Sequence, residues 1–378
     1  MRIASERIRI GLLAGCLGQG GAEKQLLYTA RALSQLGVDL RVYSLTSGEF
    51  YEDPLRKIGL QPQWIGRFPS PLFRLGRLSC ALQRFRPHIL QSTHFFTNLY
   101  TTVAGRLCGA TSIGSLRSDV SYGVNKNGRW GSALLRMPPS VITNSFAAKR
   151  NAEKLGVEGS RVHVVPNVID TADFDRQASL CHTGPLPEGR LVFAVSNLIR
   201  VKRVDLFLTA LEIARRRVGD LKGIIIGDGP ERTALESRAK ELGLSPDAVQ
   251  FLGRRDDVPA LLNRARMLVL TSDYEGFPNV ILEAMAARLP VISTAAGDSA
   301  VVVQDGRTGY VVEADVDSLA DRIVKVAKSD ELRARMGEAG RQRLEEQYDF
   351  KQLSKQLVSV YRDIARQQNN RRLLAQLQ

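Results

Sequence analysis

Residues 191–226, LVFAVSNLIRVKRVDLFLTALEIARRRVGDLKGIII, decide the fold. Leu191–Ser196 is a short apolar run of the kind that forms a buried strand. A helical pattern follows over roughly 204–217, and Gly223–Ile226 is a second apolar run. A strand, a helix and a strand with short connections form a right-handed crossover between parallel strands. This stretch therefore predicts an α/β domain built on a parallel sheet.

The same alternation extends in both directions along the chain. Further strands are predicted at 8–14, Val38–Leu45, His88–Gln91, Val141–Asn144, His163–Pro166, Val249–Leu252, Met267–Thr271 and Val291–Thr294. Helical patterns are found at about Ala22–Leu36, 231–242, 258–265 and 280–287, and the last forty or so residues are all helical. A Pro- and Gly-containing stretch, His182–Gly189, reads as a linker. We therefore expect two Rossmann-like domains, 1–180 and 186–355, with parallel sheets that face a central cleft and bind ligands beyond their carboxyl ends.

Composition describes a globular protein of ordinary type. The chain has 378 residues, of which 44% are hydrophobic and 24% charged, and its four cysteines are widely spaced with no C-x-x-C pair. We expect neither a disulfide framework nor a zinc site. Leu13–Cys16 resembles a lipid-modification box, but Arg9 interrupts the short apolar run before it, so a signal peptide is not expected. The expected location is the cytoplasm.

Positive charge is concentrated in the first half of the chain. The formal net charge is +14, and no acidic residue occurs over residues 54–118. Within that region, apolar residues have helical spacing and arginines run beside them (Leu75, Leu78, Leu82 and Phe85; Arg74, Arg77 and Arg84). Such a helix suits an anionic membrane surface, or it buries its leucines and solvates its arginines. Both interpretations stay open, and the first would place the protein on the inner face of the cell membrane. No nucleic-acid partner is expected, because no binding module accompanies the charge.

The most informative segment is TSDYEGFPNVILEAMA, residues 271–286. It places Glu275 at a strand end and Glu283 eight residues later, inside the following helix. Free N–H groups near Asn279 and Val280, at the start of that helix, favour a bound diphosphate. Glu275 can reach sugar hydroxyls, and Glu283 is positioned for a vicinal diol such as that of ribose.

Two other loops follow predicted strands. Ser196–Arg203 carries cations that would stabilise a departing diphosphate, and of these Lys202 is a better candidate than Arg203, which we expect to be solvated. Gly18–Gly21 is only a partial dinucleotide fingerprint, since Glu23 occupies the place of its third glycine. This loop either makes a tight turn or lets a phosphate approach the backbone.

Histidines and paired aspartates give weaker signals. His94 follows a strand, but a lone histidine is more often structural than catalytic. Because the chain has only four histidines and no i, i+4 pair, no histidine metal site is expected. The strings Asp173–Asp175 and Asp315–Asp317 are interpreted as structural, with Asp317 or Ser318 capping a helix.

Six motifs in order make the chain resemble the retaining glycosyltransferases of family 4, which have the GT-B fold. They are Gly20-Gly21-Ala22-Glu23, Pro166-Asn167-Val168-Ile169-Asp170, Asn197-Leu198-x-x-Val201-Lys202, Gly227-Asp228-Gly229-Pro230, Phe251-Leu252-Gly253 and Glu275-x7-Glu283. The resemblance covers nearly the whole chain. It also implies that the last helix, about 356–378, joins the first domain.

The resemblance assigns roles to residues. It implies that Glu275 contacts the transferred sugar, that Glu283 binds the ribose, and that Arg200 and Lys202 hold the diphosphate. The other positions that it places near the donor are Gly20, Gly21, His94, Asn197, Leu252, Gly253, Arg254, Gly276, Phe277, Asn279 and Val280. Many members carry their arginine at the position of Asn197, and many have glycine at the position of Pro278.

The activity that the resemblance implies is sugar transfer from a nucleotide sugar, most commonly UDP-linked. The implied acceptor is lipid-linked or a polysaccharide, as in cell-envelope or exopolysaccharide biosynthesis. Such hexosyltransferases retain the anomeric configuration and usually need no metal or other cofactor. A GT-B-like nucleotide-sugar epimerase or phosphorylase is the alternative.

Overall fold

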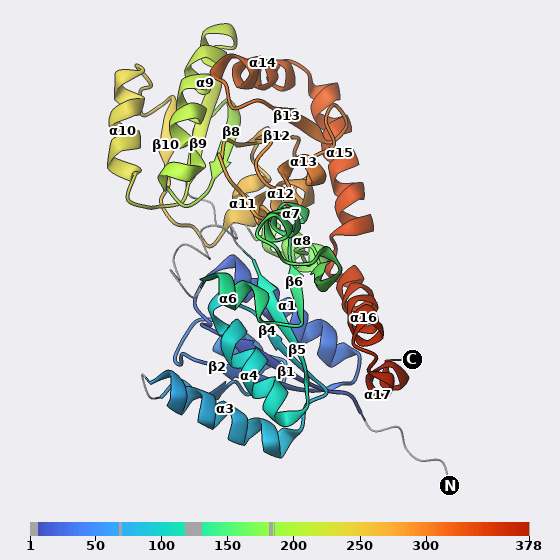
Figure 1. Cartoon of the computed structure of the whole chain (residues 1–378). Coiled ribbons are helices and arrows are strands. Elements are labelled where there is room, and N and C mark those ends of the chain that lie inside the picture. Colours follow the sequence, from blue (N-terminus) through green and yellow to red (C-terminus); the bar gives the residue numbers. More distant parts are fainter. Residues whose placement is uncertain (1–6, 68–69, 118–130, 181–183, 185, 378) are drawn as a thin grey trace. The chain divides into compact units, whose positions relative to one another are not determined.

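The computed structural model describes residues 7–67, 70–117, 131–180, 184 and 186–377. The chain forms two compact units, Met1–Val168 with Phe350–Gln378 and Ile169–Asp349 (Figure 1). Compared with the expected domains, residues 169–180 lie in the second unit and residues 350–355 in the first. The last helix was already expected to join the first domain. The expected linker His182–Gly189 lies partly outside the described residues.

A seven-stranded parallel sheet forms the centre of the first unit, in the order β3-β2-β1-β4-β5-β6-β7. Its strands are β1 (Arg9–Ala14), β2 (Asp39–Ser44), β3 (Gln63–Trp64), β4 (Ile89–Ser92), β5 (Thr111–Leu116), β6 (Ser140–Thr143) and β7 (Val162–Val164). The connecting helices are α1 (Gly21–Gln35), α2 (Glu52–Lys57), α3 (Pro71–Phe85), η1 (Phe95–Thr97), α4 (Asn98–Cys108), α6 (Gly131–Arg136), α7 (Phe146–Lys154) and η3 (Gly159–Arg161).

The end of the chain completes the core of this unit. Helix α16 (Phe350–Gln367) buries Leu353, Leu357 and Ile364 in the same apolar cluster as Leu26 of α1, and α17 (Arg371–Gln376) follows it. The hydroxyl of Tyr361 donates a hydrogen bond to Gln91 Oε1 in β4 at 2.6 Å. A buried hydroxyl needs such a partner, and this contact joins α16 to the sheet.

The second unit has a six-stranded parallel sheet, in the order β10-β9-β8-β11-β12-β13. Its strands are β8 (Arg190–Val195), β9 (Leu221–Ile226), β10 (Val249–Phe251), β11 (Met267–Leu270), β12 (Val291–Thr294) and β13 (Gly309–Val312). Its helices are α8 (Thr171–Ala178), η4 (Arg200–Lys202), α9 (Val204–Arg217), α10 (Arg232–Glu241), α11 (Val258–Leu262), α12 (Asn279–Ala286), α13 (Ser299–Val302), α14 (Val316–Ala327) and α15 (Asp330–Gln347).

A buried arginine explains why α8 belongs to the second unit. The guanidinium of Arg341, on α15, donates to both carboxylate oxygens of Asp175 at 2.7 Å and to the carbonyl of Ala286 at 2.9 Å. A bidentate arginine–carboxylate pair fixes both position and orientation. This pair therefore fastens α8 to α15.

The predicted fold class, two Rossmann-like domains with parallel sheets, is confirmed. Strands β3, β5 and β13 were not predicted. The string Asp315–Asp317 does begin a helix, but the expected cap was wrong. Asp315 itself is the N-cap of α14, because its side chain accepts the backbone N–H of Ser318 at 2.9 Å.

The basic amphipathic helix is α3, and its apolar stripe faces inward. Leu78, Leu82 and Phe85 are buried, and Leu75 packs against the apolar cluster that contains Leu78 and Leu82. This stripe is therefore part of the core. At the start of α3, however, Leu72 is 79% and Phe73 is 64% exposed. Among the described residues, no helix is long and apolar enough to cross a membrane.

Candidate active site

Each sheet reverses its strand order at one point, and the predicted site residues other than Leu252, Gly253 and Arg254 follow the strands on either side of it. In the second unit the reversal lies between β8 and β11, and in the first between β1 and β4. Open α/β sheets bind ligands at such switch points, outside the carboxyl ends of the strands. The segments 196–203 and 271–276 follow β8 and β11, while His94 and the loop before Gly21 follow β4 and β1.

At the switch point of the second unit, Lys202 and Glu275 form an ion pair. Lys202 Nζ lies 2.6 Å from Glu275 Oε1, and the two side chains are 20% and 10% exposed. The hydroxyl of Ser272 donates to the same carboxylate oxygen at 2.6 Å. Sequence reasoning missed Ser272, which is buried. The structure thus brings together Lys202, which was expected to hold the diphosphate, and Glu275, which was expected to contact the sugar.

Backbone contacts fix the loop that carries Lys202. The hydroxyl of Thr271 donates to the carbonyls of Lys202 and Arg203 at 3.0 and 2.8 Å. The N–H of Asp273 donates to the carbonyl of Val201 at 2.9 Å. Arg203 has a left-handed backbone, with φ of 47°, and its guanidinium pairs with Asp205 and Asp273. Arg203 is thus engaged in holding the two loops together.

Arg200 and Asn197 belong to the same segment as Lys202, 196–203, and are both exposed. Arg200 lines a pocket of about 740 Å³ together with Arg203, Asp205 and Asp273. In contrast to Lys202, the side chain of Arg200 is therefore open to solvent.

The start of α12 and Glu283 follow Glu275 in the sequence. Helix α12 begins at Asn279, with Pro278 as its N-cap, and Asn279, Val280 and Glu283 are all partly exposed. Phe277 is 7% exposed and packs against Tyr348, with ring centroids 5.6 Å apart. Phe277 is therefore anchored in the core.

The turn from Glu275 to Gly276 packs tightly against a neighbouring loop. The N–H of Asp298 donates to the carbonyl of Gly276 at 3.2 Å. Gly297 has φ of 57°, and a Cβ there would lie 1.9 Å from the carbonyl oxygen of Glu275. Only glycine fits this contact.

Leu252, Gly253 and Arg254 follow β10. The carbonyl of Gly253 accepts the N–H of Gly227 at 2.8 Å, and the N–H of Leu252 donates to Ile225 at 2.9 Å. Gly253 has φ of 68° and is buried, whereas the side chain of Arg254 is exposed. These residues follow the carboxyl end of β10, at the same end of the strands as the loops that follow β8 and β11.

The first unit holds Gly20, Gly21 and His94. Gly20 is the N-cap of α1, and Gly21 is its first residue. His94 Nε2 lies 3.0 Å from Glu23 Oε1, which also accepts the thiol of Cys16 at 2.9 Å. The sequence analysis considered Cys16 only in a lipid-modification box and Glu23 only in the glycine-rich motif, and neither as a partner of His94. No short-range pattern connects them to His94, which lies 71 residues beyond Glu23.

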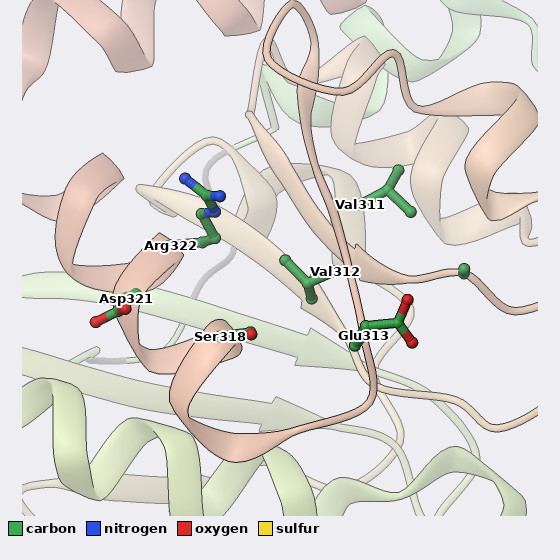
Figure 2. Close-up of a pocket in the computed structure, with 7 residues that line it drawn as sticks. Val311, Val312, Glu313, Ser318, Asp321 and Arg322 are labelled. Carbon is green, nitrogen blue, oxygen red and sulfur yellow. The ribbon is translucent and has the colours of Figure 1, made fainter.

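A separate pocket of about 380 Å³ involves none of the predicted residues. Val311, Val312, Glu313, Ser318, Asp321 and Arg322 line it near β13 and α14, together with Ala295 (Figure 2). Two of its charged groups have partners, because Asp321 pairs with Arg217 and Arg322 lies 4.7 Å from the ring centroid of Tyr310. We therefore do not assign this pocket to donor binding.

Comparison with known proteins agrees with this geometry. Residues 183–343 match the model of the family "Glycosyl transferases group 1", and residues 19–173 match that of "Glycosyltransferase Family 4". N-acetyl-alpha-D-glucosaminyl L-malate synthase of Bacillus anthracis is 35% identical over 182 residues, which are 48% of this chain and 47% of that protein. A GDP-mannose-dependent phosphatidylinositol monomannoside mannosyltransferase of Mycobacterium tuberculosis is 32% identical over 236 residues, which are 59% of this chain and 61% of that protein. The chain thus spans about half to three fifths of the length of these relatives.

Solved structures show the same fold. HepE of Anabaena, in complex with UDP, matches with a TM-score of 0.79 and 18% identity over 93% of this chain and 99% of that chain. Sucrose-phosphate synthase of Thermosynechococcus elongatus matches with a TM-score of 0.76 and 17% identity over 96% of this chain and 100% of that chain. The chain's two parallel sheets and these structural neighbours show the GT-B fold. The two family matches show that the chain belongs to glycosyltransferase family 4.

Proposed function

We propose that this protein transfers a sugar from a nucleoside-diphosphate sugar, and that its second unit binds the donor. The observation that carries the proposal is the Lys202–Glu275 pair at a switch point, directly before helix α12. A cation and helix N–H groups suit a diphosphate, and a carboxylate suits sugar hydroxyls. In this proposal Glu283 binds the ribose, while Leu252, Gly253 and Arg254 lie near the base.

We propose a UDP-hexose as the donor. HepE, which has the same fold, is solved in complex with UDP-glucose. The mannosyltransferase relative uses GDP-mannose, so a GDP-sugar is the first alternative to test.

The proposed chemistry follows from the charges at the site. The bond between the anomeric carbon and the diphosphate oxygen breaks, and a bond from the acceptor oxygen to that carbon forms on the same face, with retention. The proton of the acceptor hydroxyl passes to the departing diphosphate. Because negative charge develops on that diphosphate, the ion-paired cation Lys202 and the exposed cation Arg200 stabilise the transition state. We propose that these cations serve in place of a metal ion.

For the acceptor we propose a lipid-linked glycan or a polysaccharide, reached at an anionic membrane surface. Because the leucine stripe of α3 is part of the core, membrane contact would use the start of this helix instead. Leu72 and Phe73 are exposed there, with Arg67 and Arg74 nearby in sequence and no acidic residue over 54–118. Each arginine near an anionic surface contributes about 1 kcal/mol.

Vesicle flotation tests the membrane proposal. We expect the protein to float with vesicles that contain phosphatidylglycerol and to stay unbound with phosphatidylcholine alone. The double variant Leu72→Ser/Phe73→Ser should float less, whereas Leu36→Ser, at another exposed leucine of the first unit, should float like the wild type. Equal recovery with both vesicle types would contradict charge-led binding.

A product assay tests the transfer itself. The protein is incubated with UDP-glucose, UDP-N-acetylglucosamine or GDP-mannose, with EDTA, and with membrane lipid extract as acceptor. We expect acceptor-dependent release of one nucleoside diphosphate, and an α-linked product from an α-linked donor by NMR. Interconversion of the sugar without release would indicate an epimerase, and a requirement for inorganic phosphate would indicate a phosphorylase.

A further inference from the structure

The first unit contains a cluster of three side chains to which the proposed transfer assigns no bond-making or proton-transfer step. Cys16 follows β1, Glu23 lies in the first turn of α1, and His94 follows β4. Their ligand-type atoms all lie within 4.8 Å of one another, and the side chains of Glu23 and His94 are only 10% and 12% exposed. Such a cluster either binds a metal ion or forms a hydrogen-bond network with a fixed direction.

The backbone decides between these two interpretations. The N–H of Gly15 donates a hydrogen bond to His94 Nδ1 at 3.0 Å. A backbone N–H can only donate, so Nδ1 must offer its lone pair, and in the neutral ring the proton is on Nε2. A histidine that binds a metal through Nε2 almost always donates its other N–H to an acceptor. Here that other nitrogen accepts from the N–H of Gly15. It also lies 3.0 Å from the hydroxyl of Thr93, which contacts the carbonyl of Leu13 as well. The Gly15 contact, which only an unprotonated Nδ1 can accept, opposes a metal site.

The direction of the remaining contacts follows from this tautomer. His94 Nε2–H donates to Glu23 Oε1 at 3.0 Å, and the Cys16 thiol donates to the same oxygen at 2.9 Å. Burial, together with the hydrogen bond to Glu23, raises the pKa of Cys16 to about 12, which keeps the thiol protonated. Burial alone would raise the pKa of Glu23, but hydrogen bonds from His94 and Cys16 lower it below its ordinary value. Glu23 is therefore a buried carboxylate that accepts from both neighbours.

The glycine before α1 is part of the same arrangement. A Cβ on Gly20 would lie 2.4 Å from Glu23 Oε2, so the carboxylate lies directly over this residue. Gly20 was predicted to let a donor phosphate approach. The carboxylate of Glu23 is a second reason why this position carries no side chain.

We propose that Glu23 is a positioning residue, which holds the imidazole of His94 in one tautomer and one orientation through the Nε2–H···Oε1 hydrogen bond. This proposal rests on the proposed transfer only in that His94 is taken to lie near the transferred sugar. Both ring nitrogens of His94 are engaged within the first unit. The ring is thus fixed before any substrate arrives, and preorganisation of this kind lowers the cost of reaching the transition state.

Histidine NMR tests the geometry without any activity measurement. Protein labelled with 15N-histidine has four histidines, and His94→Gln identifies the signals of His94. We expect the wild type to show the Nε2–H tautomer at His94. We expect Glu23→Ala to shift the Nε2 resonance of His94 as the hydrogen bond is lost, and Glu23→Gln, which keeps an acceptor oxygen, to preserve most of the wild-type pattern. An Nδ1–H tautomer in the wild type would overturn the proposal, even if Glu23→Ala failed to fold.

Kinetics with matched variants tests the consequence. We expect Glu23→Ala to lower kcat about ten- to a hundred-fold, the effect of losing one hydrogen bond to a charged group, and Glu23→Gln to lower it less. Nucleoside-diphosphate affinity should stay unchanged, because the proposed contacts of the nucleotide lie in the second unit. Glu153→Ala, an exposed acid on α7, is the control. An unchanged His94 spectrum in Glu23→Ala, or an equal loss of nucleotide affinity, would refute a positioning role. If the wild type transfers no sugar, the proposed function fails, while the NMR result still decides the role of Glu23.

Discussion

From the Lys202–Glu275 ion pair we predict opposite changes in UDP affinity when its two members are substituted. If Lys202 binds the diphosphate, it must share its charge between Glu275 and the ligand. Lys202→Met removes one contact to a charged group, and UDP should bind about 2 kcal/mol, or roughly 30-fold, more weakly. Glu275→Gln removes the competing carboxylate. UDP, which carries no sugar for Glu275 to contact, should then bind more tightly.

The size of that gain follows from the burial of the pair. The two atoms are 2.6 Å apart, and the side chains are 20% and 10% exposed. Exposed pairs contribute about 0–1 kcal/mol, and loss of one partner from a fully buried pair costs about 3–5 kcal/mol. An intermediate value of about 1–2 kcal/mol predicts roughly 5- to 30-fold tighter UDP binding by Glu275→Gln.

Calorimetric titration of UDP into both variants and the double variant measures these effects. The double variant should bind like Lys202→Met, because Glu275 acts on UDP through Lys202 alone. Transfer by Glu275→Gln should be lost despite the tighter binding of UDP. Unchanged or weaker UDP binding by Glu275→Gln would refute the competition, and with it the role given to Lys202.

Three further changes test the fold and the site. Arg341→Ala should lower the free energy of unfolding by about 2 kcal/mol in urea, because Arg341 is buried among acidic partners, whereas Arg366→Ala, at an exposed pair, should change it by less than about 0.5 kcal/mol. Gly297→Ala should cost about 1–2 kcal/mol of stability and abolish transfer, since the added Cβ would displace the backbone of Glu275; full activity would contradict this. Because the pKa of Cys16 is raised, the folded state keeps a proton that the unfolded state releases, so the free energy of unfolding should fall between about pH 9 and 12. The free energy of unfolding of Cys16→Ala should fall less steeply over that range.

Strong local patterns were sufficient to predict most of the elements. Helix α9 was found at the predicted 204–217, and β12 at the predicted Val291–Thr294. Strand β5, in contrast, has the sequence TSIGSL, in which every residue is buried but only two are large and apolar. Its position is set by the neighbouring strands β4 and β6 on both sides, which no local pattern reveals.

The site was predictable only where its residues are close in sequence. Glu275 and Glu283 are separated by one loop and one helical turn, so their spacing carries information. The partners of Lys202 and His94 lie 73 and 71 residues away, and the fold alone brings them together. Sequence reasoning could therefore name Lys202 and His94 as candidates without finding Glu275 or Glu23 as their partners.

The central claim is that the second unit binds a nucleoside diphosphate with its ribose on Glu283. Calorimetric titration of UDP, GDP and ADP, with EDTA present, tests this most directly on the wild type, on Glu283→Ala and on the control Glu346→Ala, an exposed acid of α15. We expect one nucleotide, UDP, to bind tightly, Glu283→Ala to weaken it at least about ten-fold, and Glu346→Ala to bind like the wild type. If no nucleotide binds, or if Glu283→Ala binds as well as the wild type, the assignment of the donor site is wrong.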